Sequence, residues 1–379
     1  MARPISEYPV LLYLVLVLII ASCRPLIYNI PDITDHKIFP YRVINNSPDY
    51  VFFFERNCED NRLGQAIFIN KQELLPNAVC LDDYMDHSKT VAFLIIRRDT
   101  ILYEKYMEPY DEGSIFNTFS VTKMFITTLI GIAIREGYIE SVNQPVTDYI
   151  QELAGIDGFD KLTIRHLLLH TSGIRFSDIK YSPFSDNARY YYGRNLRKLL
   201  MKVELYTEPG KEIHYSSPNV QLLGLILERA TGTTLSSYLE EKIWKELGMK
   251  YPAKWSLDNN TDHSFEKCFS SLNCTATDLA RLGRLYLNNG YYNMKQILPE
   301  DFYSNCTSRD TTDGSTWTFQ YNLGLSPKGY ESFYSSGLYG QLIYIYPKKN
   351  LIIVRVGKKD LKYNPQFLRN NILQIIDQI

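Results

Sequence analysis

The sequence predicts an α+β fold, in which an antiparallel β-sheet is flanked by helices and interrupted by an inserted all-helical region. Two strand hairpins are indicated, one near each end of the main part of the chain, and segments with helical periodicity lie between them. The chain has 379 residues, of which 45% are hydrophobic and 22% charged, so it can bury a substantial core. Its length favours one large domain or two closely joined ones.

The hairpins are indicated by runs of β-branched and aromatic residues on either side of polar turns. Residues 91–96 and 101–106 flank the turn Arg97-Arg98-Asp99-Thr100. Residues 340–346 and 351–356 flank the turn Pro347-Lys348-Lys349-Asn350. Because the hairpins lie on both sides of the helical segments, we expect them to share one sheet.

Helices are expected where apolar residues recur at helical spacing up to a stop signal. These segments are 120–137, 163–170, 219–230, 234–247, 278–287 and 365–379. The predicted organisation is an N-terminal extension at 23–85, an α/β catalytic domain formed by 86–144 and 256–379, and a helical subdomain at 145–255.

The N-terminus has the features of an export signal. Residues 10–21 are almost wholly apolar, which suits a signal peptide and is short of the roughly 20 residues that span a bilayer. The run ends in Ile20-Ala21-Ser22-Cys23, which resembles a bacterial lipobox. We expect residues 1–22 to be a lipoprotein-type signal peptide and Cys23 to carry a lipid. The chain would then be an exported membrane lipoprotein facing the periplasm or cell exterior of a bacterium. An uncleaved anchor and an ordinary secretory signal are the alternatives.

The charge balance excludes one class of partner. Lys and Arg total 41 and Asp and Glu total 42, so the basic excess typical of nucleic-acid-binding proteins is missing. The expected partners are a small-molecule substrate and, through the lipid anchor, a membrane.

Five cysteines besides Cys23 leave at least one thiol unpaired if the others form disulfides. Cys268 and Cys274 are close enough in sequence to pair, but the sequence alone does not fix the connectivity. None of the cysteines has the Cys-x-x-Cys spacing of a zinc or redox motif.

The motif Ser-x-x-Lys occurs three times, beginning at Ser120, Ser177 and Ser264, so it is weak evidence by itself. Only the first copy opens an apolar helix directly after a predicted hairpin. On a helix, Ser120 and Lys123 would be about 60° apart in rotation and about 4.5 Å apart in rise, so the amine could reach the hydroxyl. A serine hydroxyl needs such a base to become a nucleophile, and a helix N-terminus favours a developing anion. A capping serine with a solvated lysine is the alternative.

Four segments in this order resemble the serine β-lactamase-like, or penicillin-binding-protein, family. They are Phe119–Lys123, Leu162–Gly173, Pro209–Gly224 and Ala276–Leu287. This family includes class C β-lactamases, D-Ala-D-Ala peptidases and related esterases and amidases, and the resemblance spans roughly residues 90–360. The fourth segment, with residues 185–191, is most similar to the 6-aminohexanoate-dimer hydrolase branch. The resemblance implies the β-lactamase/transpeptidase-like fold.

The resemblance also implies catalytic roles. Ser120 would be acylated, Lys123 would accept its proton, and Tyr215 would act as a second acid/base. Tyr215 matches the family's Tyr-x-Asn element, although Ser217 stands where the Asn is usual. The backbone N–H groups of Ser120 and Leu338 would form the oxyanion hole.

Substrate-binding roles are expected for Ser217, Asp186, Tyr190, Ser336 and Gly337. No cofactor or metal is expected. His166 and His170 have the i, i+4 spacing of metal ligands on a helix, but no Glu follows His166 and no third ligand is evident.

The substrate class is indicated by a missing cation. Relatives carry Lys-Thr-Gly or His-Thr-Gly where this chain has Ser335-Ser336-Gly337, which is similar to the variant in esterases and amidases of this fold. We therefore expect a serine hydrolase acting on a carboxylic ester or small amide. A D-Ala-D-Ala carboxypeptidase or β-lactamase is the alternative, as is a non-catalytic penicillin-binding sensor, although a sensor has no use for Ser, Lys and Tyr together.

Overall fold

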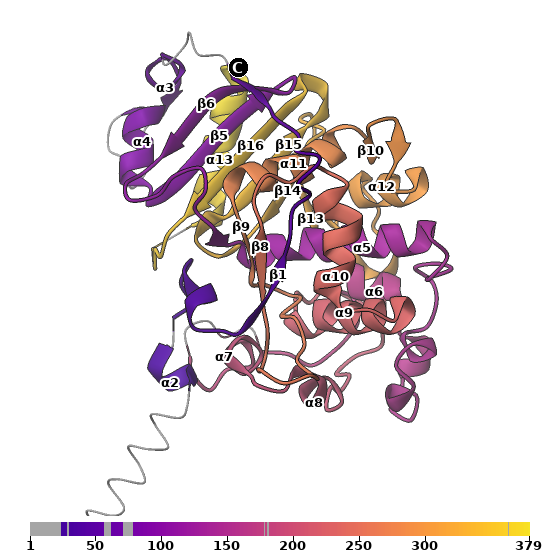
Figure 1. The fold of residues 1–379 in the computed structure, drawn as a ribbon. Helices are drawn as coiled ribbons and strands as arrows, with labels where there is room; N and C mark the ends of the chain where they lie inside the picture. The colour runs from indigo at the N-terminus through magenta and orange to yellow at the C-terminus, as the bar shows by residue number, and fades with distance from the viewer. Residues whose placement is uncertain are drawn as a thin grey trace, which may run out of the picture.

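The structure is a computed structural model and has the predicted α+β architecture, with antiparallel sheets flanked by helices (Figure 1). It describes residues 24–28, 30–56, 62–70, 79–177, 179, 182–362 and 364–379. The predicted signal peptide and Cys23 lie outside the described residues. Within them, no helix is long and apolar enough to cross a membrane.

The main sheet has eight strands in the order β12-β13-β14-β15-β16-β5-β6-β2. Its neighbouring strands are antiparallel except β2 and β6, which are parallel. The strands are β2 (Glu55–Arg56), β5 (Thr90–Arg97), β6 (Thr100–Tyr106), β12 (Phe319–Gln320), β13 (Leu323–Leu325), β14 (Phe333–Ser336), β15 (Leu342–Tyr346) and β16 (Leu351–Gly357). Both predicted hairpins are confirmed, as β5–β6 and β15–β16, and the pairing of β16 with β5 joins them into one sheet.

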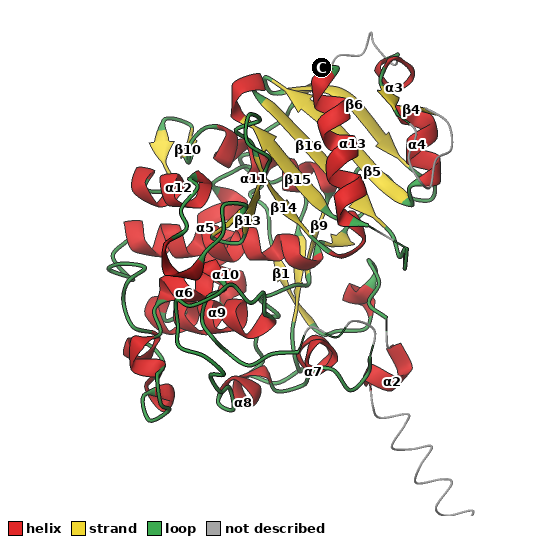
Figure 2. Cartoon of the chain, turned by 180° about the vertical axis from the view of Figure 1, so that it is seen from behind, coloured by secondary structure: helices red, strands yellow, loops and turns green. Residues whose placement is uncertain are grey.

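Helices cover both faces of this sheet, so its central strands are buried on both sides. Leu94 and Ile96 of β5 face the core that contains α5 (Thr122–Arg135) and α11 (Ala276–Leu287). Phe93 and Ile95 alternate with them and pack with α4 (Leu81–His87) and α13 (Pro365–Asp377). Figure 2 shows α13 lying across the face of the sheet opposite α11.

A smaller antiparallel sheet connects the N-terminal segment to the turn that precedes Ser120. Its order is β1-β8-β9-β7, with β1 (Tyr41–Ile44), β8 (Ala253–Ser256), β9 (Leu272–Cys274) and β7 (Phe116–Asn117). Ile33, Phe39 and Ile44 are buried in the main core. The segment expected to be a loosely defined extension therefore forms part of the sheet and of the core.

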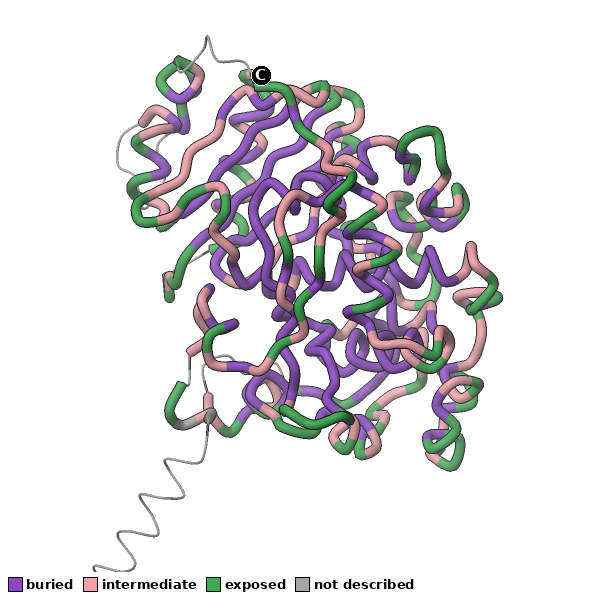
Figure 3. Tube along the Cα trace, viewed as in Figure 1, coloured by how far each residue is buried: buried purple, intermediate pink, exposed green. Residues whose placement is uncertain are grey.

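The helical region lies beneath the main sheet in Figure 1 and packs against it through α5. Buried segments gather at this junction (Figure 3). The elements are α6 (Ile164–Leu169), α7 (Asp186–Tyr192), α8 (Leu196–Leu200), α9 (Ser217–Thr231), α10 (Leu235–Leu239) and the π-helical η6 (Glu240–Lys245). The predicted helix at 234–247 is thus observed as α10 followed by η6. The remaining α-helices are α2 (Arg24–Tyr28), α3 (Leu63–Ala66) and α12 (Glu300–Thr307). Two short strand pairs complete the sheets, β3 (Phe68–Ile69) with β4 (Val79–Cys80) and β10 (Tyr291–Tyr292) with β11 (Lys295–Gln296).

Two details differ from the sequence-based expectation. The helix predicted from Ser120 begins at Thr122, and Ser120 lies in the preceding 3-10 turn η2 (Phe119–Val121). Cys268 and Cys274 are not paired with each other; both thiols are free and buried. The Cys268 thiol donates to the carbonyl oxygen of Glu266 at 3.1 Å, whereas Cys274 ends strand β9.

Candidate active site

The structure brings Ser120, Lys123 and Tyr215 together, although Tyr215 is about 90 residues from the other two along the chain. Ser120 lies in η2, Lys123 in the first turn of α5, and Tyr215 in the loop before α9. The Lys123 Nζ atom is 2.9 Å from the Ser120 Oγ atom and 5.0 Å from the centroid of the Tyr215 ring. The three side chains predicted to act as nucleophile, base and second acid/base therefore lie next to one another.

The surroundings of Lys123 leave its amine directed at Ser120. The side chain is only 2% exposed, and Nζ also donates to the Phe269 carbonyl oxygen at 2.6 Å. None of the ion pairs found in the described part of the chain joins Lys123 to a carboxylate. Its partners are thus a hydroxyl and a carbonyl, both neutral.

Ser120 follows a residue with unusual backbone geometry. Phe119 adopts φ +46°, in the left-handed region that side-chain-bearing residues rarely enter. The Asn117 Oδ1 atom accepts a hydrogen bond from the Phe119 N–H at 2.9 Å, and Thr118 N–H donates to Leu272 of β9 at 3.0 Å. These bonds fix the turn that presents Ser120, and strained backbone of this kind is common at active sites.

Gly337 brings a second backbone segment against this turn. A Cβ atom at Gly337 would lie 3.0 Å from the Ser120 nitrogen and 2.8 Å from the Thr118 carbonyl oxygen, so a larger residue would displace the turn. Leu338, the next residue, lines the pocket beside Ser120. The backbone at Gly337 therefore lies against that of Ser120, and Leu338, the predicted second oxyanion donor, is the next residue.

His170 is a site residue that the sequence reasoning missed. Its ring stacks on Tyr215, with centroids 4.5 Å apart and planes at 23°. The Ser216 N–H donates to Nδ1 at 3.0 Å, so the proton is on Nε2, which donates to the Asn322 Oδ1 atom at 2.8 Å. Burial, followed by the charge of Lys123, lowers the pKa of His170 to about 3. His170 is thus neutral, and the Tyr215 ring stacks on its imidazole.

His166 and His170 have the spacing of metal ligands, although no metal site was predicted, and in the structure they make separate contacts. His166 Nδ1 and the Thr163 hydroxyl are 3.1 Å apart in the cap that starts α6. His170 ends the same helix in a left-handed conformation, φ +59°. Among the described residues, no group of three or more His, Cys, Asp or Glu side chains could hold a metal ion.

Ser120 lies between two pockets. The larger, of about 620 Å³, is formed mainly by β12 to β14 and α13, and its lining includes Phe319, Tyr334 and Arg369. The smaller, of about 360 Å³, is lined by residues of the N-terminal segment, α7 and the Leu338 turn. Of the predicted substrate-binding residues, Ser336 lines both pockets, and Ser217 and Gly337 line the smaller one. An acyl group and a leaving group could occupy opposite sides of Ser120.

Two predicted binding residues, Asp186 and Tyr190, do not line either pocket. The Asp186 carboxylate accepts from the Ser177 N–H at 2.9 Å and pairs with Arg189 at 3.0 Å. Tyr190 packs between Phe176 and Phe269. Instead, Asn187, Tyr191 and Tyr192 of the same helix line the smaller pocket, because they lie on the other face of α7.

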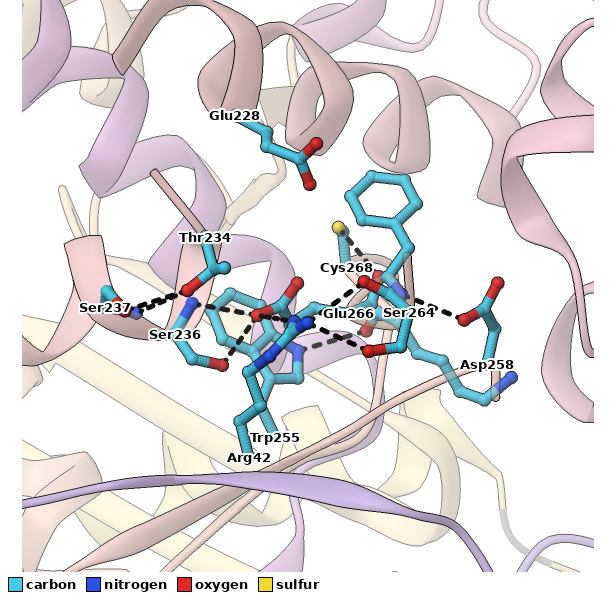
Figure 4. Close-up of polar contacts among 12 residues, drawn as sticks. Arg42, Glu228, Thr234, Ser236, Ser237, Trp255, Asp258, Ser264, Glu266 and Cys268 are labelled. Carbon is cyan, nitrogen blue, oxygen red and sulfur yellow. Dashed lines mark hydrogen bonds and ion pairs between the residues drawn. The ribbon is translucent and has the colours of Figure 1, made fainter. Parts of the chain in front are cut away.

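The third copy of Ser-x-x-Lys does not bring its serine and lysine together. The Ser264 hydroxyl accepts from Arg42 at 2.9 Å, within the network around Glu266 that Figure 4 shows. Lys267 Nζ donates to the Gly193 carbonyl oxygen at 3.1 Å. In the second copy, Lys180 lies outside the described residues.

Comparisons with known proteins identify the family and the fold. The family model described as Beta-lactamase matches residues 78–370. A 6-aminohexanoate-dimer hydrolase of Paenarthrobacter ureafaciens is 27% identical over 299 residues, which cover 73% of this chain and 74% of that protein.

Among solved structures, one from Bacillus anthracis that is assigned to the 6-aminohexanoate-dimer hydrolases superposes with a TM-score of 0.79 at 24% identity, covering 90% of this chain and 91% of that one. EstCE1, a hydrolase with promiscuous acyltransferase activity, gives 0.61 at 18% identity, covering 78% and 95%. The fold is therefore that of the serine β-lactamases and their relatives. Since the family model covers most of the sequence, the chain belongs to the β-lactamase family of serine hydrolases.

Proposed function

We propose that this chain hydrolyses a carboxylic ester or a small amide through an acyl-enzyme on Ser120. The observation that carries the proposal is the 2.9 Å contact between Lys123 Nζ and Ser120 Oγ at the junction of two pockets. A buried amine in contact with a serine hydroxyl is an arrangement that activates a nucleophile. The names of the curated relative and of EstCE1 are consistent with acyl chemistry on this fold.

The reaction would proceed in two halves. Lys123 accepts the Ser120 proton as Oγ bonds to the substrate carbonyl carbon, and the N–H groups of Ser120 and Leu338 stabilise the resulting oxyanion. The bond to the leaving group then breaks, and the leaving group takes a proton from Tyr215, which is resupplied from Lys123. Water attacks the acyl-enzyme by the reverse sequence and releases the acid. Tyr215 suits this role because it is 40% exposed and lines both pockets.

The residues that replace the family's Lys-Thr-Gly element favour neutral substrates. Ser335 and Ser336 of β14 carry no charge, so they cannot form a charge-assisted bond with a substrate carboxylate, a bond worth about 1.5–3 kcal/mol. We expect kcat/KM for a short p-nitrophenyl ester to exceed that for nitrocefin by about tenfold to a hundredfold, after correction for intrinsic reactivity. The two are compared on one enzyme preparation, and the esterase/amidase proposal fails if nitrocefin remains the better substrate.

The second candidate, a substrate with a free carboxylate, has one observation in its support. Arg369 of α13 lines the larger pocket, while the exposed Lys328 does not. The Arg369 Nη2 atom donates to Gln366 Oε1 at 2.6 Å, and this bond holds the guanidinium along the wall of the pocket. If an amide or β-lactam carboxylate binds there, Arg369→Gln should reduce turnover of the carboxylate substrate and leave the neutral ester unaffected. Arg369→Gln is thus the control that separates the two substrate classes.

A penicillin-binding sensor is distinguished by the lifetime of its adduct. A fluorescent penicillin and a fluorophosphonate are each followed over time on the same protein. A stable penicillin adduct without turnover would support the sensor and contradict hydrolysis.

We also propose that the chain is exported and anchored by a lipid on Cys23. The support is the lipobox-like sequence Ile20-Ala21-Ser22-Cys23 after a short apolar run. Intact-mass measurement of the protein extracted from membranes should show a mature chain that begins at a lipid-modified Cys23. A different mature N-terminus, or an unmodified Cys23, would refute the anchor.

A further inference from the structure

Three alternating residues of the N-terminal segment contact the two turns of the active site and the wall of the smaller pocket. The Ile33 carbonyl oxygen accepts the Asn117 N–H at 2.8 Å, and the Pro31 carbonyl oxygen accepts the Tyr339 hydroxyl at 2.8 Å. The Asp35 carboxylate accepts the Tyr191 hydroxyl at 2.7 Å. One short segment thus reaches the turn before Ser120, the turn after Gly337, and the wall of the smaller pocket.

The contacts of Asp35 continue as a directional chain of hydrogen bonds toward Ser120. Because the Tyr191 hydroxyl donates its proton to Asp35, its oxygen accepts from the Asn117 Nδ2 atom, at 2.9 Å. The amide of Asn117 is thereby oriented with Oδ1 toward the Phe119 N–H, also at 2.9 Å. Each bond fixes the direction of the next.

All three side chains that form these hydrogen bonds are buried. Asn117 is 0% exposed, Tyr191 6% and Asp35 7%. A buried polar group that loses its partner cannot recover the bond from water, so the chain holds one arrangement. Burial also raises the pKa of Asp35 to about 6, against the lowering effect of its hydrogen bonds from Asp32 N–H and Tyr191. The fold keeps a carboxyl group here even though desolvation opposes its ionised form.

The chain of hydrogen bonds ends at Phe119, the strained residue before Ser120. Phe119 has φ +46°, a conformation that needs outside support, and its N–H is held by Asn117. The peptide that follows Phe119 carries the Ser120 N–H, so the orientation of Phe119 sets the direction of one oxyanion donor.

The second turn is tied to the first through the same segment. Tyr339, with φ +62°, packs edge-on against Phe119 with ring centroids 5.6 Å apart, and its hydroxyl is bound to Pro31. Gln341 Nε2 donates to the Asn117 carbonyl oxygen at 3.2 Å. The Leu338 turn and the Ser120 turn are therefore braced against each other and against residues 31–35.

We propose that residues 31–35 are a built-in part of the active site, and that Asp35, through Tyr191 and Asn117, positions the Ser120 N–H for oxyanion stabilisation. Asp35 is a positioning residue because it acts through two other side chains and lines neither pocket. The inference rests on the proposed acyl-enzyme function. It assigns a role in catalysis to a segment that is far in sequence from every motif of the catalytic centre.

The test compares full-length variants on a short p-nitrophenyl ester. Asp35→Ala and Tyr191→Phe remove the hydrogen bond between these two side chains. Asp35→Asn keeps an oxygen that can accept from both Asp32 N–H and Tyr191. We expect kcat to fall about tenfold to a hundredfold in the first two, with KM changed less than about twofold, because a misaligned oxyanion donor affects the transition state more than binding. Asp35→Asn should restore kcat to within about threefold of the wild type. Lys37→Ala, an exposed neighbour in the same short helix η1 (Asp35–Lys37), is the matched control and should leave kcat unchanged.

Hydrogen-exchange mass spectrometry of the peptide that covers residues 117–121 gives a readout independent of turnover. Its exchange should rise in Asp35→Ala and Tyr191→Phe and stay at the wild-type level in Asp35→Asn and Lys37→Ala. Wild-type kcat in folded Tyr191→Phe would overturn the inference, as would a rise in KM alone. If the wild type neither hydrolyses esters nor reacts with a fluorophosphonate, the proposed function fails, and the positioning role fails with it. If hydrogen exchange is unchanged in Asp35→Ala and Tyr191→Phe, the chain of hydrogen bonds itself is wrong.

Discussion

Replacing Ser120 with alanine is expected to abolish ester hydrolysis and labelling by a fluorophosphonate. The variant lacks the only hydroxyl in hydrogen-bond contact with Lys123 Nζ among the described residues, so no acyl-enzyme can form. The expected loss in kcat/KM is at least about 10³-fold, and the activity that remains would come from the binding site alone. The measurement is steady-state kinetics on the best ester, with gel-based labelling of the same samples.

The other two Ser-x-x-Lys copies supply matched controls. Ser177→Ala and Ser264→Ala should both retain hydrolysis and labelling. Ser177 is exposed, and Ser264 is bonded to Arg42 rather than to Lys267. Full activity in Ser120→Ala would remove the basis of the mechanism.

Replacing Lys123 should have the second-largest effect. A positioned general base contributes about 10²–10⁴-fold to a rate, so Lys123→Met should lower kcat/KM by about that factor. Lys123→Arg should lose nearly as much, because a guanidinium keeps the positive charge but cannot give up its proton near neutral pH. The loss should appear equally in the rate of fluorophosphonate labelling, which reports only the activation of Ser120.

A folding defect is separated from a catalytic one by measuring the free energy of unfolding of each variant in denaturant. Lys123→Met leaves the buried Phe269 carbonyl without the Lys123 donor, so a modest loss of stability is expected. Lys123→Arg that folds normally and hydrolyses the ester at the wild-type rate would show that this residue is not the base.

The fold was predictable where its signals are local. Both hairpins, α5, α9, α11 and α13 follow from the period of apolar residues and from the Gly, Pro and Asn that bound them. The small sheet was not predictable, because β1 pairs with β8 and β7 with β9 over long separations and these strands have at most four residues. The role of residues 31–44 was unpredictable for the same reason, because their structure depends on partners that are distant in the sequence.

The candidate site divides in the same way. Ser120, Lys123 and Tyr215 lie in short motifs whose spacing is visible in the chain. His170, Asp35 and Arg369 matter through partners that the fold brings from elsewhere, namely Tyr215, Tyr191 and the larger pocket.

Sequence reasoning placed Asp186 and Tyr190 in the substrate-binding pocket, although other residues of α7 line it. A one-residue error on a helix turns a side chain by about 100° and moves it to another face. The motifs thus predicted which side chains lie together at Ser120, but not which residues of α7 line the pocket.

The central claim, an acyl-enzyme on Ser120, is tested most directly by mass spectrometry of the enzyme quenched during turnover of a slowly hydrolysed ester. The account predicts a mass increase equal to the acyl group, mapped by peptide digestion to Ser120, which forms with the first burst of product and decays at the steady-state rate. An enzyme that turns over the ester with no adduct, or with the adduct on any other residue, would contradict it.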